Sequence, residues 1–156
     1  MEKELGRGIS ATNLAYSTVS TSVGALIFCV STQRCLFLMR SNRQRNTWGL
    51  VGGKQEPGET TLETLHREFG EELGSVPAYQ RLIPIETYTS NDQAFRYLTY
   101  VCLVDREFLP VLNHEHHGYC WIQMGHWPRP LHPGLWNTVN FQEIKTKIDT
   151  LFRLFV

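Results

Sequence analysis

The residues most able to do chemistry lie close together near the middle of this 156-residue chain. Residues 53–75, GKQEPGETTLETLHREFGEELGS, hold six glutamates and one arginine, although the formal net charge of the whole chain is zero. Clustered carboxylates form either an ordinary solvated surface or a site for divalent cations, because Mg²⁺ and Mn²⁺ prefer oxygen ligands. Residue types alone leave both interpretations open.

The element that positions these glutamates is a predicted helix over residues 60–73. Thr60 or Thr61 caps its start, and Gly74 marks its end. Gly70 lies inside it, where glycine costs about 1 kcal/mol relative to alanine, so we expect a neighbouring loop to pack closely there. The helix is amphipathic, because its apolar residues recur every three or four positions. These residues are Leu62, Leu65, Phe69 and Leu73, and we expect this stripe to pack on the sheet.

Three glutamates share one face of this helix, because Glu68 and Glu72 are four residues apart and Glu71 lies between them. Like charges at such spacings destabilise an isolated helix by a few tenths of a kcal/mol per pair. A helix that needed only solubility would interleave lysines, whereas only His66 and Arg67 do so here. The helix by itself still allows either a solvated face or a metal site.

The flanking spacing resembles the signature of the Nudix hydrolases, G-x5-E-x7-R-E-U-x-E-E-x-G-U, in which U is a bulky apolar residue. Every fixed residue is present from Gly53 to Gly74, and only the final U is replaced, by Ser75. The preceding WGLVGG is similar to the family's lead-in, with Val51 where proline is frequent. The resemblance implies an α/β fold, a Nudix-type α/β/α sandwich with a mixed β-sheet between helices.

The resemblance also implies a cation site. By position, Glu68, Glu71 and Glu72 bind Mg²⁺ or Mn²⁺ together with the backbone carbonyl of Gly52. Cations held at a pyrophosphate stabilise the negative charge that builds on its bridging and leaving oxygens. Glu68 or Glu71 is the general base that accepts a proton from the attacking water. The family differs in which glutamate has this role, so both stay open.

Arg67 matches the family's arginine that orients the acidic residues. Its expected partner is Glu59, eight residues earlier. The alternative is a surface ion pair between Glu63 and Arg67, which contributes little to stability.

A second candidate segment is LNHEHHGYCWI, residues 112–122. Its histidines suggest a transition-metal site, but their spacing does not match a usual zinc pattern. The segment resembles the family's E-H-x-x-Y-x-W, matched by Glu115, His116, Tyr119 and Trp121. That resemblance implies that Glu115 is a further metal ligand or the base, whereas a solvated carboxylate is the alternative. Tyr119 and Trp121 are expected in the core.

Substrate recognition is predicted at Arg40, Arg45 and Trp127. Arg40, Arg43 and Arg45 lie at a strand end and in the loop before the glutamate segment, where they suit phosphates or a ribose. Trp127 could stack on a base, because aromatic faces suit nucleobases. Solvated arginines and a tryptophan held against the core are the alternatives.

The function implied by the resemblance is that of a Mg²⁺- or Mn²⁺-dependent pyrophosphohydrolase. It hydrolyses a nucleoside diphosphate linked to another moiety X to a nucleoside monophosphate and phosphorylated X. Nucleotide sugars such as ADP-ribose, dinucleoside polyphosphates and (d)NTPs are all open as substrates. The alternatives are a GDP-sugar glycosyl hydrolase of the same family and a catalytically inactive Nudix-like module that binds nucleotides or RNA. Both usually lose residues that are intact here. Homodimers are common in the family, so a homodimer is one expectation.

Composition restricts the partners. Zero net charge and a pI near 7.0 give no overall attraction to nucleic acid or to anionic membranes, so neither partner is expected. The apolar runs are too short to span a bilayer, and the N-terminus lacks the apolar core of a signal peptide. Four cysteines without CxxC spacing indicate reduced core thiols and a cytoplasmic protein.

The remaining pattern predicts strands and one further helix. The helix begins at Leu135 or Asn140 and ends at Phe155. We expect an N-terminal extension over residues 1–16 and a single Nudix hydrolase domain over residues 17–156. The expected strands cover residues 17–30, 35–40, 48–53, 82–88, 95–104 and 119–122.

Overall fold

The computed structural model describes residues 19–41 and 46–155. The predicted extension, residues 1–16, lies outside the described residues. The division of the chain into an extension and one domain therefore stays a prediction.

The described strands agree with the sequence pattern, with three main differences, one of which is that the strand expected from residue 82 begins at Tyr79. The predicted strand over residues 48–53 is interrupted at Leu50, because its two halves pair with different neighbours. The last strand begins at His116 and not at Tyr119. The strands are β1 (Ser20–Cys29), β2 (Arg34–Arg40), β3 (Trp48–Gly49), β4 (Val51–Lys54), β5 (Tyr79–Thr89), β6 (Phe95–Val104) and β7 (His116–Gln123).

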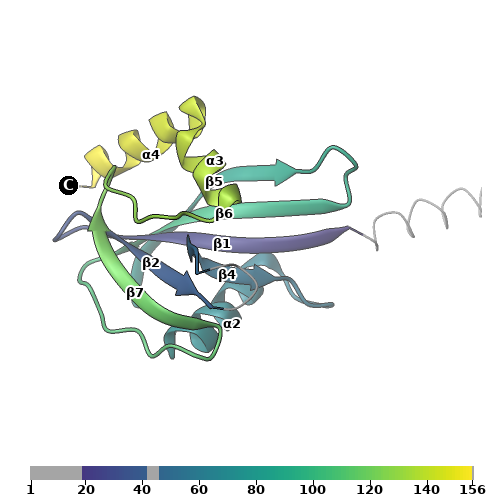
Figure 1. Ribbon diagram of the computed structural model, residues 1–156, viewed down its shortest axis with the longest axis horizontal. Coiled ribbons are helices and arrows are strands. Elements are labelled where there is room, and N and C mark those ends of the chain that lie inside the picture. Colours follow the sequence, from purple (N-terminus) through teal and green to yellow (C-terminus); the bar gives the residue numbers. More distant parts are fainter. Residues whose placement is uncertain (1–18, 42–45, 156) are drawn as a thin grey trace, which may run out of the picture.

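Strand β1 organises the sheet (Figure 1). β6 runs parallel to it along one edge, over all ten residues of β1. The other edge is shared, because β4 pairs with residues 22–25 of β1 and β2 pairs with residues 27–29. The remaining pairs are antiparallel, including β7 on β2. The result is a mixed sheet in which the partner of β1 on this edge changes from β4 to β2 at Leu26, two residues after Gly24, which pairs with Gly52 of β4.

Helices cover both faces of this sheet (Figure 1). Alternate residues of β1 point to opposite sides. Val23 and Ile27 lie in the hydrophobic cluster under α2 (Thr61–Leu73), whereas Leu26 and Phe28 lie in the cluster under α3 (Pro133–Asn140) and α4 (Gln142–Leu154). The predicted α/β fold with a mixed sheet between helices is therefore confirmed.

The predicted single C-terminal helix is wrong in one respect. It is two helices, because Phe141 has an extended backbone (φ −73°, ψ 120°) and separates α3 from α4. Phe141 ends the first helix by donating its N–H to the carbonyl of Asn137.

Helix α2 begins and ends as its flanking residues predict. Thr60 caps its start: the Thr60 hydroxyl accepts from the Glu63 N–H, and the Glu63 carboxylate accepts from the Thr60 N–H. This capping box satisfies two otherwise unpaired donors. Gly74 closes the other end in the left-handed conformation (φ 89°). There it also leaves room for Val111, because a Cβ at Gly74 would lie 2.8 Å from the Val111 Cβ.

Two expectations about α2 are wrong. Leu65, Phe69 and Leu73 are buried, but Leu62 in the first turn is 48% exposed, because it lies outside both hydrophobic clusters. Among the described residues no loop packs closely at Gly70, since a Cβ there would have none of their atoms within 4 Å.

The state of the cysteines and the character of the helices concern the predicted location of the protein. Cys29, Cys35 and Cys102 are buried thiols and Cys120 is half-buried, and all four are unpaired. Across residues 19–41 and 46–155, no helix has both the length and the apolar character needed to cross a lipid bilayer.

Candidate metal and active site

Arg67 joins helix α2 to the loop before it. Its Nε donates to Glu59 Oε2 at 2.8 Å and its Nη2 donates to Glu59 Oε1 at 3.1 Å. Nη2 also donates to the carbonyl of Lys54 at 2.9 Å. The guanidinium lowers the pKa of Glu59 to about 2. The predicted Glu59 pairing is therefore present, and Glu63 is engaged in the capping box instead.

The same guanidinium holds two further carboxylates. Arg67 Nη1 donates to Glu68 Oε1 at 3.0 Å and to both oxygens of Glu71 at 3.3 Å. Glu71 is exposed, whereas Glu68 is only 7% exposed and faces the sheet. The Glu68 carboxylate lies directly on the backbone of Gly53, where a Cβ would be 2.6 Å from Glu68 Cδ. Gly53 is therefore a glycine because a side chain would displace this carboxylate.

Glu72 is the most buried carboxylate of the helix, at 1% exposure. Its Oε1 accepts a hydrogen bond from the Gly52 N–H at 2.7 Å. Burial raises the pKa of Glu72 to about 8, although the Gly52 N–H opposes this shift. Gly52 lies so close to β1 that a Cβ would be 2.6 Å from Gly24 Cα. The predicted Gly52 carbonyl ligand stays a prediction, since the described contact is through its N–H.

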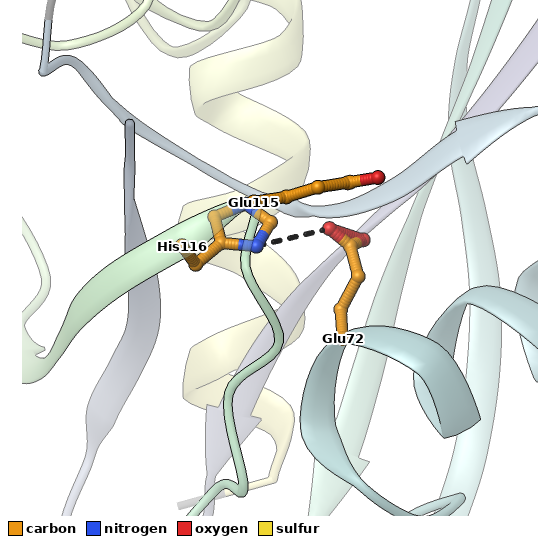
Figure 2. Close-up of side chains that lie close together, drawn as sticks. All are labelled: Glu72, Glu115 and His116. Carbon is orange, nitrogen blue, oxygen red and sulfur yellow. Dashed lines mark ion pairs between the residues drawn. The ribbon is translucent and has the colours of Figure 1, made fainter. Parts of the chain in front are cut away.

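Glu115 reaches this group from the loop before β7. Its carbonyl accepts from the Ser41 N–H at 3.0 Å, and its N–H donates to Asn113 Oδ1 at 3.1 Å. Donor atoms of Glu72, Glu115 and His116 all lie within 4.8 Å of one another (Figure 2). The structure therefore brings two segments of the chain, more than 40 residues apart, to one potential cation site.

His116 is a site residue that the sequence reasoning missed. It is 4% exposed, and its Nδ1 lies 3.4 Å from Glu72 Oε2. Burial, together with the charge of Arg40, lowers the pKa of His116 to about 4, so the ring is neutral near pH 7. Its position directly after Glu115 in the E-H-x-x-Y-x-W pattern was the available signal.

Tyr97 was also missed. Its ring crosses β1 at Gly24, where a Cβ would lie 3.0 Å from Tyr97 Cζ. Burial raises the pKa of the phenol to about 12, and the charges of Arg40, Glu72 and Glu68 also act on it. A glycine inside a strand is typical of such close approach, so Gly24 was the available signal.

The three predicted substrate residues lie in different surroundings. Arg40 ends β2 opposite His116 of β7, and its charge acts on Glu72 and His116. Trp127 packs edge-on against Phe37 at 5.6 Å, in the cluster under α3 and α4. Arg45, with its neighbour Arg43, lies outside the described residues.

The two aromatic residues expected in the core differ. Trp121 packs in the cluster under α2, and its indole N–H donates to the Phe108 carbonyl at 3.2 Å. Tyr119 is 37% exposed, so that expectation is wrong for Tyr119. By the alternation along β7, Tyr119 shares the face of Trp121, but among the described residues it packs in neither hydrophobic cluster.

The donor set fits a dication that prefers oxygen ligands. Glu68 and Glu72 are buried carboxylates on one helix face, and Glu115 acts electrostatically on both of them. Burying such charges is costly unless an opposite charge compensates them. Arg67 contacts Glu68, and the most buried member, Glu72, has the Gly52 N–H as its hydrogen-bond partner.

Residues 20–140 match the model of the NUDIX domain. This match covers well over half of the chain, and the fold and the glutamate helix agree with it. The chain therefore belongs to the NUDIX family.

Two relatives and one solved structure illustrate the similarity. The mouse nucleoside diphosphate-linked moiety X motif 6 is 34% identical over 80 residues, which cover 51% of this chain and 26% of the mouse protein. The dihydroneopterin triphosphate diphosphatase of Haemophilus influenzae is 30% identical over 116 residues, 65% of this chain and 72% of that protein. The chain thus spans about a quarter of the length of the mouse relative.

The structural comparison concerns the NUDIX domain of Shewanella oneidensis NrtR, solved in complex with ADP-ribose. It superposes with a TM-score of 0.62 at 20% identity, covering 84% of this chain and 87% of that one. At this identity the likeness shows the fold alone.

Proposed function

We propose that this chain is a divalent-cation-dependent pyrophosphohydrolase. Its substrate is a small molecule in which a nucleoside diphosphate is linked to another moiety X, and its products are a nucleoside monophosphate and phosphorylated X. Mg²⁺ or Mn²⁺ is the proposed cofactor.

One observation carries this proposal: Glu68 and Glu72 are buried against the sheet, at 7% and 1% exposure. A solvated helix face would leave both carboxylates in water. Two like charges four residues apart destabilise a helix, and burial adds a desolvation cost. A bound dication offsets both terms, so the arrangement favours a cation site over a solvated face.

When bound, Mg²⁺ or Mn²⁺ supplies charge neutralisation at the pyrophosphate and lowers the pKa of a bound water. Glu68, Glu72 and Glu115 hold the cation, with Glu71 at the exposed edge. Arg67 fixes Glu68 and Glu71 relative to each other, since one guanidinium nitrogen contacts both. The attacking water must lose a proton, and a carboxylate of this group accepts it.

Glu68 and Glu71 both stay proposals for the general base. Glu68 is buried and is also proposed to hold the cation, which would reduce its basicity, whereas Glu71 is exposed to solvent.

Substrate recognition is proposed at Arg40, Arg45 and Trp127. Arg40 has the strongest support, because its charge acts on the carboxylate group and its Nε is buried without a hydrogen-bond partner among the described residues. Such a guanidinium suits a phosphate oxygen. Trp127 is half-buried and packs on Phe37, so only part of its ring is available to a base.

We also propose that the protein acts in the cytoplasm, because its four cysteines are unpaired thiols. A homodimer stays a prediction, which size-exclusion chromatography with light scattering would test.

The proposed activity is tested by chromatographic detection of the nucleoside monophosphate formed from a panel of nucleotide sugars, dinucleoside polyphosphates and (d)NTPs. Wild type is compared with Glu72→Gln and Glu71→Gln, and Gly70→Ala is the matched control on the same helix, since a Cβ there contacts nothing. We expect turnover that requires Mg²⁺ or Mn²⁺ and falls at least about a hundredfold in Glu72→Gln.

Turnover that survives chelation or the Glu72→Gln change would contradict the metal mechanism. A release of free sugar without cleavage of the phosphoanhydride would identify a glycosyl hydrolase instead. Nucleotide binding without turnover over the whole panel would identify a binding module.

A further inference from the structure

We propose that His116 is itself a metal ligand, through Nδ1, in a site completed by Glu72 and Glu115. The site therefore prefers a dication that accepts imidazole, such as Co²⁺ or Zn²⁺, to Mg²⁺. The inference rests on the proposed function only in assuming that these carboxylates bind a cation, and it adds a nitrogen donor and a metal preference.

The ring of His116 lacks partners for both of its polar atoms. The residue is 4% exposed, and within residues 19–41 and 46–155 neither Nδ1 nor Nε2 has a hydrogen-bond partner. Buried polar atoms are nearly always paired, and an exception calls for a bound water or ion. An unpaired buried group costs about 1–3 kcal/mol. A metal ion on Nδ1 removes one of these two costs.

The spacing of the donors agrees with a shared ion. Nδ1 of His116 lies 3.4 Å from Glu72 Oε2, beyond the usual N–H···O distance of about 2.9 Å. Two donors that are each about 2.1 Å from one ion stand about 3.0 Å apart at right angles and about 3.4 Å apart at the tetrahedral angle. Figure 2 shows the ring nitrogen directed at the Glu72 carboxylate, with Glu115 beside it.

The charge of the donor groups and the access of solvent to the site also agree with a bound dication. The two carboxylates carry together the charge that one dication neutralises, and His116 adds a neutral donor. Glu72 and His116 are buried, whereas Glu115 is exposed, so the site opens to solvent on the Glu115 side. The His116 backbone is fixed by an N–H bond to the Asn113 carbonyl at 3.3 Å and by pairing with Arg40.

A nitrogen donor changes which ion binds best. Mg²⁺ prefers oxygen ligands and retains its waters, whereas imidazole suits later transition metals. A site of carboxylates alone also favours Co²⁺ over Mg²⁺ to some extent, because affinity rises along the transition series. The diagnostic quantity is therefore the change in the Co²⁺-to-Mg²⁺ affinity ratio when only the imidazole is removed.

The experiment is calorimetric titration of the metal-free protein with Co²⁺ and with Mg²⁺, for wild type and His116→Asn. His114→Asn is the control, because His114 is an exposed histidine of the same loop. We expect His116→Asn to lose at least about tenfold in Co²⁺ affinity while its Mg²⁺ affinity changes less than about twofold. His114→Asn keeps both affinities.

A second measurement uses the wild type and His114→Asn, so it does not depend on the folding of His116→Asn. The ¹H NMR spectrum of the Co²⁺-loaded protein should contain hyperfine-shifted imidazole protons, and these should persist in His114→Asn. Their absence from the wild-type spectrum, or equal losses of Co²⁺ and Mg²⁺ affinity in His116→Asn, would overturn the inference. Imidazole signals in a protein that hydrolyses no nucleotide would refute the proposed function and leave this inference standing.

Discussion

Replacing Gly53 by alanine tests whether the position of the Glu68 carboxylate governs activity. The added Cβ would lie 2.6 Å from Glu68 Cδ and 2.9 Å from Oε2, both closer than real Cβ contacts. The Gly53 backbone itself accepts alanine, since Gly53 is not among the residues with positive φ. The perturbation therefore acts on one carboxylate.

The size of the effect follows from these distances. An ordinary contact begins near 3.4 Å, so the Glu68 carboxylate must retreat by roughly 1 Å. It is the end of a side chain with rotatable bonds, and an off-rotamer shift costs about 0.5–1.5 kcal/mol. A misplacement of about 1 Å at a catalytic group reduces the rate by about a hundredfold. That rate loss corresponds to about 2.7 kcal/mol in the activation barrier.

Steady-state kinetics at saturating metal, with thermal unfolding of the same samples, measures both effects. We expect kcat to fall about a hundredfold in Gly53→Ala while Tm changes by a few degrees at most. Gly70→Ala is the matched control: it fills open space, removes the cost of a helical glycine and should raise Tm by about 2–4 °C at unchanged kcat. A Gly53→Ala enzyme whose kcat stays within about threefold of wild type would refute the reasoning.

Three further predictions concern the same helix. Phe69→Ala should reduce the free energy of unfolding by about 3–5 kcal/mol in urea titrations, because Phe69 is fully buried, whereas Leu62→Ala should change it by less than about 0.5 kcal/mol. Arg67→Lys should lower kcat/KM at least about tenfold, because an ammonium group cannot hold Glu59 with two hydrogen bonds and also reach Glu68; an unchanged kcat/KM would contradict the orienting role. In metal-free protein the pKa of Glu72 is raised from 4.5 to about 8. Between pH 4.5 and pH 8 the folded state therefore keeps a proton that the unfolded state has released. The free energy of unfolding consequently falls as the pH rises through this range. Glu72→Gln should therefore lessen the fall of Tm between pH 5 and pH 8 in EDTA, and equal pH slopes in the two proteins would count against a buried, protonated Glu72.

The features of α2 that local sequence determines could be predicted. Its cap at Thr60 and its end at Gly74 depend on the residues that flank the helix, and their positions in the chain carry that information directly. The pairing of Arg67 with Glu59 followed from the family resemblance, whereas helical spacing alone offered Glu63. Leu62 was misassigned because helical periodicity gives the direction of a side chain but not how far the sheet extends beneath it.

The site residues that the sequence did not predict are brought into place by strand pairing. His116 meets Glu72 because β7 pairs with β2, and Tyr97 packs on Gly24 because β6 lies parallel to β1. Such contacts join segments separated by tens of residues, for which neither spacing nor propensity gives the register. The division of residues 48–53 at Leu50 has the same origin, since its halves follow different partners.

The end of α2 at Leu73 has an electrostatic consequence. The peptide dipoles of a helix place partial negative charge at its C-terminus, where an acidic side chain is unfavourable by about 0.3–1 kcal/mol. The last turn of α2 contains no basic residue and carries Glu71 and Glu72. A cation bound by these carboxylates also interacts favourably with this partial negative charge. Because the carboxylates lie at the C-terminal end of this helix, the helix dipole increases the affinity for a cation. The same arrangement lowers the stability of the protein when no cation is bound.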